Sequence, residues 1–180
     1  RGNPDAHVLI SDWGWKGHGD SLEIVPLLPD DIWLMSVSEW HLPIERGGIQ
    51  STVGEYSISS VGPGPRAVPH WKAAQARGLK TGTEIQFNNT CEIATVPYLP
   101  VMDLVAEHCH NLLTQANLNA MFIGWTMGGH PSPNIDLAQR LMRSSSPSVE
   151  EVLNEIALER YGADGAPLAR QAWTAMSNTF

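Results

Sequence analysis

The sequence lacks a long hydrophobic run and a basic cluster. No stretch reaches the roughly 18 apolar residues of a membrane-spanning helix, so we expect no membrane span and no membrane partner. The 11 Lys and Arg residues stand against 19 Asp and Glu residues, which gives a formal charge of −8. Because phosphate backbones are bound by clustered basic residues, this composition disfavours a nucleic-acid partner. A neutral or cationic ligand suits it better.

The sequence also lacks the spacings of metal and nucleotide sites. Cys91 and Cys109 are the two cysteines, and they form no CxxC motif. His108 and His110 are two positions apart on a predicted helix and therefore point to different sides, unlike the i, i+4 pair of a zinc helix. The glycines of GWKGHG at 14–19 have the wrong offsets for a phosphate-binding turn. We therefore predict no metal site and no cofactor.

A Met at the first position is missing as well. The chain starts with Arg1 and enters a predicted strand within a few residues, so we expect the N-terminus of the natural protein to be absent. A targeting signal would lie in that segment. The sequence therefore predicts no localisation, and both a cytoplasmic and an exported protein remain as alternatives.

The composition is otherwise that of an ordinary globular protein, but it includes many tryptophans. The chain of 180 residues is 42% hydrophobic and 17% charged, as expected for one domain or a large part of one. It has seven Trp but only three Phe and three Tyr. Four of the tryptophans lie at the ends of predicted strands, where core packing alone is a poor explanation for an indole ring: Trp13, Trp15, Trp40 and Trp125. Their placement favours a binding surface at the strand ends.

The stretch 32–43, IWLMSVSEWHLP, contains the most informative pattern. Mostly apolar residues run as in a buried strand, and the sequence then changes to Ser, Glu, Trp and His before Pro43 prevents further strand pairing. The same change occurs in VLISDWGW, TEIQFNNT and AMFIGWT. These segments predict strands near 7–13, 32–39, 79–88 and 120–125.

Each predicted strand is followed by a helix, which describes consecutive βα units of a parallel sheet. We predict an α/β fold that is the second half of a (β/α)₈ TIM-type barrel, with an open doubly wound sheet as the alternative. Residues 1–143 would form this half barrel, and 144–180 a helical C-terminal extension of two helices that packs on it. The long connection 42–64 is expected to fold over the strand ends, where βα loops build sites.

Asp12 and Trp13, in DWGW, are candidate ligand-binding residues. Indole rings stack on the apolar faces of sugar rings, and carboxylates accept hydrogen bonds from hydroxyl groups. Trp13 and Trp15 share one side of an extended chain while Asp12 faces the other, so one side could serve packing instead. Trp125 is a candidate for the floor of the same pocket, with core packing as the rival interpretation.

Glu39 and Trp40 are the strongest candidates for a catalytic site. A carboxylate that an indole shields from water has its neutral form favoured, which a general acid requires. Glu39 is therefore the candidate catalytic residue, and Trp40 a candidate substrate-binding residue. The competing interpretation is a structural ion pair between Glu39 and Arg46 or Lys16.

The third predicted strand ends in two amides, Asn88 and Asn89. Amide groups donate to and accept from hydroxyl groups, so both are candidate substrate-binding residues. Glu84 shares its side of the strand with Asn88 but lies deeper, which favours a structural role.

The set DWGW, SVSEW, QFNNT and GWTMGG at successive strand ends resembles the C-terminal half of bacterial (β/α)₈-barrel glycoside hydrolases. It is most similar to uncharacterised proteins near the family 20 hexosaminidase group. The resemblance implies sugar binding by Trp13, Trp40 and Trp125, with Asp12, Glu39 and Asn89 nearby. In that family an Asp-Glu catalytic pair ends the fourth strand, which here would precede Arg1, so the pair is not assigned to this chain.

The prediction is a carbohydrate-active barrel that forms part of a glycoside hydrolase. Such enzymes cleave O-glycosidic bonds with two carboxylates. A non-catalytic sugar-binding barrel is one alternative, and a barrel lyase or isomerase acting on sugar acids is another. The expected partners are a carbohydrate ligand and either the missing N-terminal half or a second copy of the chain.

Overall fold

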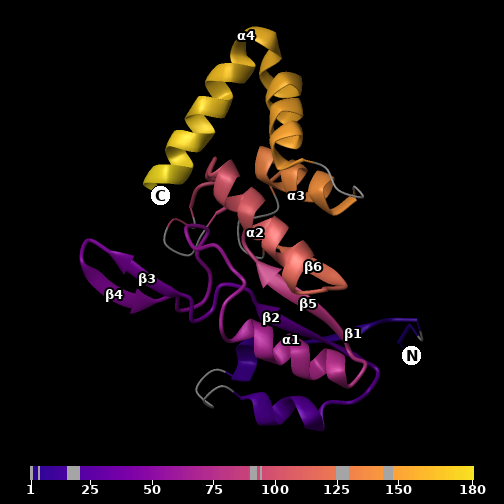
Figure 1. Ribbon diagram of the computed structural model, residues 1–180. Coiled ribbons are helices and arrows are strands. Elements are labelled where there is room, and N and C mark those ends of the chain that lie inside the picture. The colour runs from indigo at the N-terminus through magenta and orange to yellow at the C-terminus, as the bar shows by residue number, and fades with distance from the viewer. Residues whose placement is uncertain are drawn as a thin grey trace.

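The computed structural model describes residues 2–3, 5–15, 21–89, 93, 95–124, 130–143 and 148–180. Four strands form one sheet in the order β1-β2-β5-β6, and all neighbours are parallel (Figure 1). The strands are β1 (Val8–Ser11), β2 (Ile32–Val37), β5 (Lys80–Ile85) and β6 (Ala120–Ile123). The predicted α/β fold with a parallel sheet is confirmed.

Every strand ends earlier than predicted, and after β1 and β2 the polar residues that follow turn away from the ladder. After β1, a 3₁₀ helix η1 occupies Asp12–Trp15. After β2, the N–H of Leu42 donates to the carbonyl of Glu39 at 3.0 Å and closes a turn. The sequence pattern located the strands but did not separate their last residues from these turns.

Helices follow the strands along the chain, as the βα pattern predicted. They are η2 (Leu22–Leu27), α1 (Ala67–Ala76), α2 (Met102–Gln115), α3 (Pro133–Arg143) and α4 (Val149–Thr179). The Ser132 hydroxyl accepts from the N–H of Ile135 at the start of α3, and Gly78 after α1 has the left-handed φ of +81° that such an end requires. Gly162 interrupts α4 with φ 70° and ψ 178°, so α4 consists of two helical segments.

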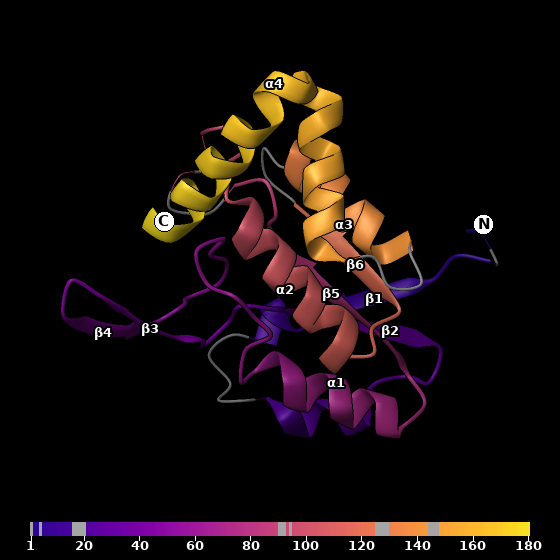
Figure 2. The ribbon, with the colours of Figure 1, turned by 45° about the horizontal axis from the view of Figure 1, so that its top comes forward.

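The described helices cover one face of the sheet. Paired residues of parallel strands lie on the same face, and the register places Ile10 beside Leu34 and Ile85 beside Ile123. Ile10 and Leu34 pack with α1 and η2, whereas Ile85 and Ile123 pack with α2, α3 and α4. Figures 1 and 2 agree that α1 and α2 lie on the same side of the strands.

The opposite face of the sheet carries Leu9, Trp33, Met35 and Phe122, which alternate with the residues under the helices. None of the described helices packs against it. The Phe122 side chain is 42% exposed. The apolar surface of this face is therefore only partly covered, and we call it the open face.

The long connection 42–64 divides into two parts. The first is a hairpin of β3 (Pro43–Arg46) and β4 (Ile49–Thr52), which projects away from the sheet (Figure 1). The expectation that the whole connection folds over the strand ends was wrong for this part. Gly47 and Gly48 have positive φ and form its two-residue turn. Only the following segment, 53–60, returns to the sheet, with Val53, Tyr56 and Ile58 buried.

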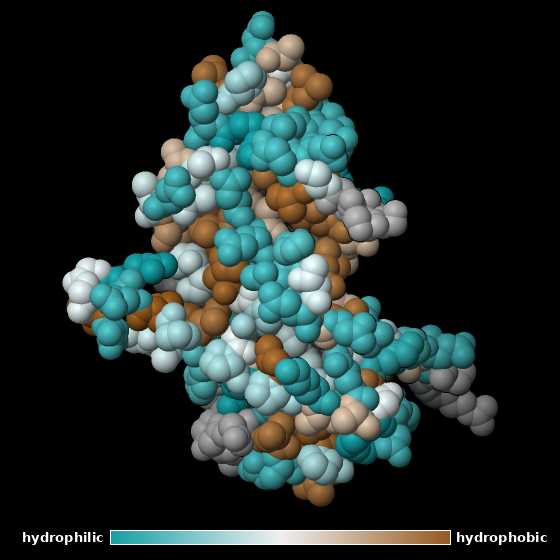
Figure 3. All heavy atoms as spheres, in the orientation of Figure 1, coloured by the Kyte–Doolittle hydropathy of each residue, from teal (hydrophilic) through white to brown (hydrophobic). Residues whose placement is uncertain are grey.

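The two segments of α4 pack on α2 and α3 through buried apolar residues. Val152, Ile156 and Trp173 belong to the same cluster as α2 residues. Figure 3 views this helix-covered side, where hydrophobic residues lie mainly between the helices and hydrophilic residues on their outer surfaces. Cys109 is buried within α2, and burial raises the pKa of its thiol to about 12.

Candidate ligand site at the strand ends

A small cavity of about 200 Å³ lies at the carboxyl ends of the strands. It is lined by Ser11, the last residue of β1; Trp13 in η1; Glu84 near the end of β5; and Tyr56 from the returning segment. Segments distant in the sequence meet here because parallel strands end at the same edge of the sheet. Ser11 and Glu84 belong to the open face, so the cavity joins the strand ends to that face.

A short hydrogen-bond chain fixes the polar wall of the cavity. The backbone N–H of Trp13 donates to Ser11 Oγ at 3.3 Å, and the Ser11 hydroxyl donates to Glu84 Oε2 at 2.6 Å. Within the described part of the chain Glu84 forms no ion pair. The Trp13 side chain is 44% exposed, whereas Tyr56 is 4% exposed. The cavity thus combines a carboxylate, a hydroxyl group and two aromatic rings.

Asp12 and Trp13, predicted as neighbours in one site, are placed apart. Asp12 is completely buried, and its Oδ2 lies 2.6 Å from Nδ1 of His70 in α1. The Asp12 carboxylate therefore connects η1 to α1. Trp13 lines the cavity, as the sugar-binding interpretation requires.

Glu39 and Trp40 lie at the end of β2 and are not among the residues that line the cavity. The Glu39 side chain is completely buried, and Trp40 is 2% exposed. Trp40 packs with Val37 and Tyr56, and the guanidinium of Arg66 lies 4.2 Å from the centre of its ring. Trp40 therefore supports Tyr56, which forms part of the cavity wall.

The cations considered as partners of Glu39 are placed elsewhere or fall outside the described residues. Arg46 lies in β3 and donates to the backbone carbonyls of Glu45 and Ser59. Lys16 is outside the described residues.

The two amides at the end of β5 are completely buried and bind backbone and side-chain groups. Asn88 donates to the carbonyl of His130 at 2.7 Å and accepts from the Ser132 hydroxyl. Asn89 donates to the carbonyl of Val96 at 3.3 Å. Asn88 thus fixes the start of α3. Trp125, the remaining candidate, lies outside the described residues.

Ser11, Tyr56 and Glu84 were not selected from the sequence as site residues. Ser11 directly precedes the selected DWGW motif, so its position at a strand end was a usable signal. Glu84 was assigned a structural role because it lies deeper in its strand, yet it reaches the cavity wall. Tyr56 carried no signal, because its place depends on where the hairpin ends and the chain returns.

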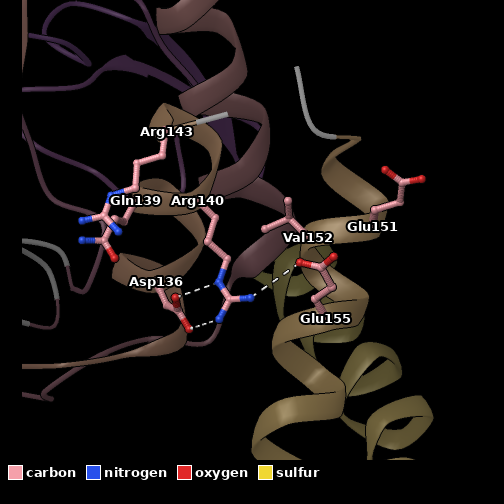
Figure 4. Close-up of a pocket in the computed structure, with 7 residues that line it drawn as sticks. All are labelled: Asp136, Gln139, Arg140, Arg143, Glu151, Val152 and Glu155. Carbon is pink, nitrogen blue, oxygen red and sulfur yellow. Dashed lines mark hydrogen bonds and ion pairs between the residues drawn. The ribbon is translucent and has the colours of Figure 1, made fainter. Parts of the chain in front are cut away.

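A second, larger hollow of about 550 Å³ lies between α3 and α4 (Figure 4). Its central group is Arg140, which contacts Asp136 at 2.9 Å and Glu155 at 3.6 Å. Glu159 binds the same guanidinium, and the hydrogen bonds that Arg140 donates to Glu159 and Asp136 raise the pKa of Arg140. These ion pairs hold α4 against α3, so we assign this hollow to helix packing.

Comparisons with known protein families, with curated proteins and with solved structures found no match. Within the described residues, no group of three or more His, Cys, Asp or Glu side chains is arranged to hold a metal ion. None of the described helices is both long and apolar enough to cross a membrane.

Proposed function

We propose that this chain is the C-terminal half of a carbohydrate-active (β/α)₈ barrel and that the complete protein is a glycoside hydrolase. The observation that carries the proposal is the cavity of Ser11, Trp13, Tyr56 and Glu84 at the carboxyl ends of the strands. Aromatic rings next to a carboxylate and a hydroxyl group suit the two kinds of surface on a sugar.

The half-barrel part of the proposal is supported by the sheet. Its four strands follow one another in chain order and are all parallel, and the described helices cover one face. All-parallel sheets in proteins are normally covered on both faces. Eight such strands close into a barrel whose interior side chains fill the space, and the open face would then form half of that interior.

Glycoside hydrolysis needs two carboxylates on either side of the glycosidic oxygen, separated by roughly 5 to 10 Å. Glu84 is the one carboxylate that lines the cavity within the described residues. We propose that Glu84 and Ser11 bind sugar hydroxyl groups, that Trp13 and Tyr56 stack on a ring, and that Glu39 acts from the end of β2. The remaining catalytic groups would come from the rest of the barrel.

The experiment that tests the proposal is a calorimetric titration of the protein with soluble β-1,4-linked trisaccharides. Trp13→Ala should weaken binding at least about fivefold, because aromatic stacking contributes on the order of 1 kcal/mol beyond area burial. Tyr161→Ala is the matched control, since Tyr161 in α4 is 46% exposed and Trp13 44%. If no saccharide binds, or if both variants lose affinity equally, the proposal is wrong.

A non-catalytic sugar-binding barrel is the second candidate, and it is favoured because the described residues contribute a single carboxylate to the cavity wall. This candidate predicts that oligosaccharides bind without being cleaved. Incubation of the complete protein with the trisaccharides that it binds, followed by chromatography of the products, separates the two candidates.

A further inference from the structure

The cavity at the strand ends holds a carboxylate whose negative charge is not balanced by a described residue. Among the described residues, none forms an ion pair with Glu84, and the Ser11 hydroxyl is the one side chain that donates a hydrogen bond to its carboxylate, at Oε2. Glu84 is partly buried, and even partial burial of a carboxylate without a cation costs free energy. A ligand that brings a positive charge would remove that cost.

The neighbouring groups suit a cation as well. The Ser11 oxygen accepts the N–H of Trp13 while its own proton points to Glu84, so the hydroxyl is already committed as a donor. Trp13 and Tyr56 line the same cavity as Glu84, and aromatic faces attract ammonium groups. A carboxylate that shares a cavity with two aromatic residues therefore suits the recognition of an ammonium group.

The size and charge of the molecule limit the ligand further. The cavity of about 200 Å³ is smaller than the roughly 300–1,000 Å³ of sites for drug-sized ligands, so it suits one ring or a smaller group. The formal charge of −8 favours the approach of a cation over that of an anion.

We infer that the cavity of Ser11, Trp13, Tyr56 and Glu84 binds an amino sugar through its protonated amine, with Glu84 as the counter-ion. This inference rests on the proposed function and narrows its substrate class. It separates three sugars that share one shape: a neutral sugar with a hydroxyl group at carbon 2, an amino sugar with an ammonium group there, and an acetylated sugar with a neutral acetamido group.

The test uses three β-1,4-linked trisaccharides that differ at carbon 2 alone: cellotriose, the glucosamine trimer and its fully acetylated form. The glucosamine trimer should bind roughly five- to tenfold more tightly than cellotriose, as expected for a half-buried ion pair. Added salt should weaken the binding of the glucosamine trimer and leave that of cellotriose unchanged, because only the first involves charge attraction. This salt comparison needs no variant and so does not depend on variant folding.

Glu84→Gln keeps the shape and the acceptor for Ser11 but removes the charge, so it should abolish the preference for the ammonium group. Glu45→Gln is the matched control, because Glu45 lies in the exposed hairpin strand β3. Equal affinity for cellotriose and the glucosamine trimer, or tighter binding of the acetylated trimer, would overturn the inference and leave the proposed function standing. Failure of all three sugars to bind would overturn both.

Discussion

The Ser38 hydroxyl oxygen lies 2.7 Å from Nε2 of His108, and both side chains are buried. Burial lowers the pKa of His108 to about 3, so the ring is neutral near pH 7 and shares one hydrogen bond with the Ser38 hydroxyl. Gly62 lies against both groups, since a β-carbon there would collide with His108 Nε2 and approach Ser38 Oγ to 2.7 Å. The pair joins the end of β2 to α2 and is closed to substrate, so it serves the fold.

Stability should fall in mild acid because of His108. Its pKa is about 6.5 in the unfolded chain and about 3 in the folded one, so between these values the unfolded state binds more protons. Stability is fully present above pH 6.5 and should decrease by up to about 1.4 kcal/mol per pH unit below it. Urea unfolding between about pH 7 and pH 5 measures the slope, which should be smaller in His108→Gln. The corresponding substitution of the exposed His110 is the control. An unchanged slope in His108→Gln would contradict the assignment of this pH dependence to His108.

Asp12→Asn should lower the free energy of unfolding by about 1.5–3 kcal/mol, because it removes the charged partner of a buried hydrogen bond to His70. Sugar binding by the folded variant should persist. Asp5→Asn, an exposed position, is the control. A variant of normal stability that no longer binds sugar would instead place Asp12 in the ligand site.

Trp40→Ala should destabilise the protein by about 3–5 kcal/mol, since the ring is buried among Val37, Tyr56 and Arg66. Trp13→Ala should change stability far less, because Trp13 is half exposed. Thermal unfolding of both variants provides the comparison. A stable Trp40→Ala protein with a binding defect would show that the ring contacts ligand directly.

Glu39→Gln tests the catalytic assignment in the complete protein. The change keeps the shape and removes the charge, and we expect kcat/KM to fall roughly tenfold to 150-fold, as for one lost hydrogen bond to a charged group. Loss of a general acid or base typically costs about 10² to 10⁴ and also removes one limb of the pH-rate profile. A loss near the upper end of that range, with the limb gone, would make Glu39 a general acid or base.

The sequence predicted the sheet well because buried parallel strands are short apolar runs, which need no knowledge of distant residues. The roles of polar residues at the strand ends depend on such knowledge. Asp12 lies 58 positions from His70 and Asn88 44 positions from Ser132. Without these partners, a buried structural carboxylate or amide has the same local sequence signal as a binding residue. The hairpin at 43–52 was not predicted, although Gly47-Gly48 between two extended runs is a recognisable turn signal.

Self-association of the isolated chain is the last prediction. The open face exposes Phe122 beside Leu9, Trp33 and Met35, and each outer strand of the described sheet has an edge without a neighbour. Unpaired edges and apolar faces promote association, so the 180-residue chain should sediment as a dimer or larger species.

Phe122→Asp should shift this chain toward the monomer without loss of helical circular dichroism, because it places a charge on the partly exposed open face. Leu168→Asp in α4 is the matched control, since Leu168 is 66% exposed and lies away from that face. It should leave the sedimentation profile unchanged. A stable, monodisperse monomer of the unmodified chain would contradict the half-barrel proposal, because half of a barrel interior would then face water without consequence. Equal effects of the two substitutions would show that association depends on general surface hydrophobicity instead of the open face.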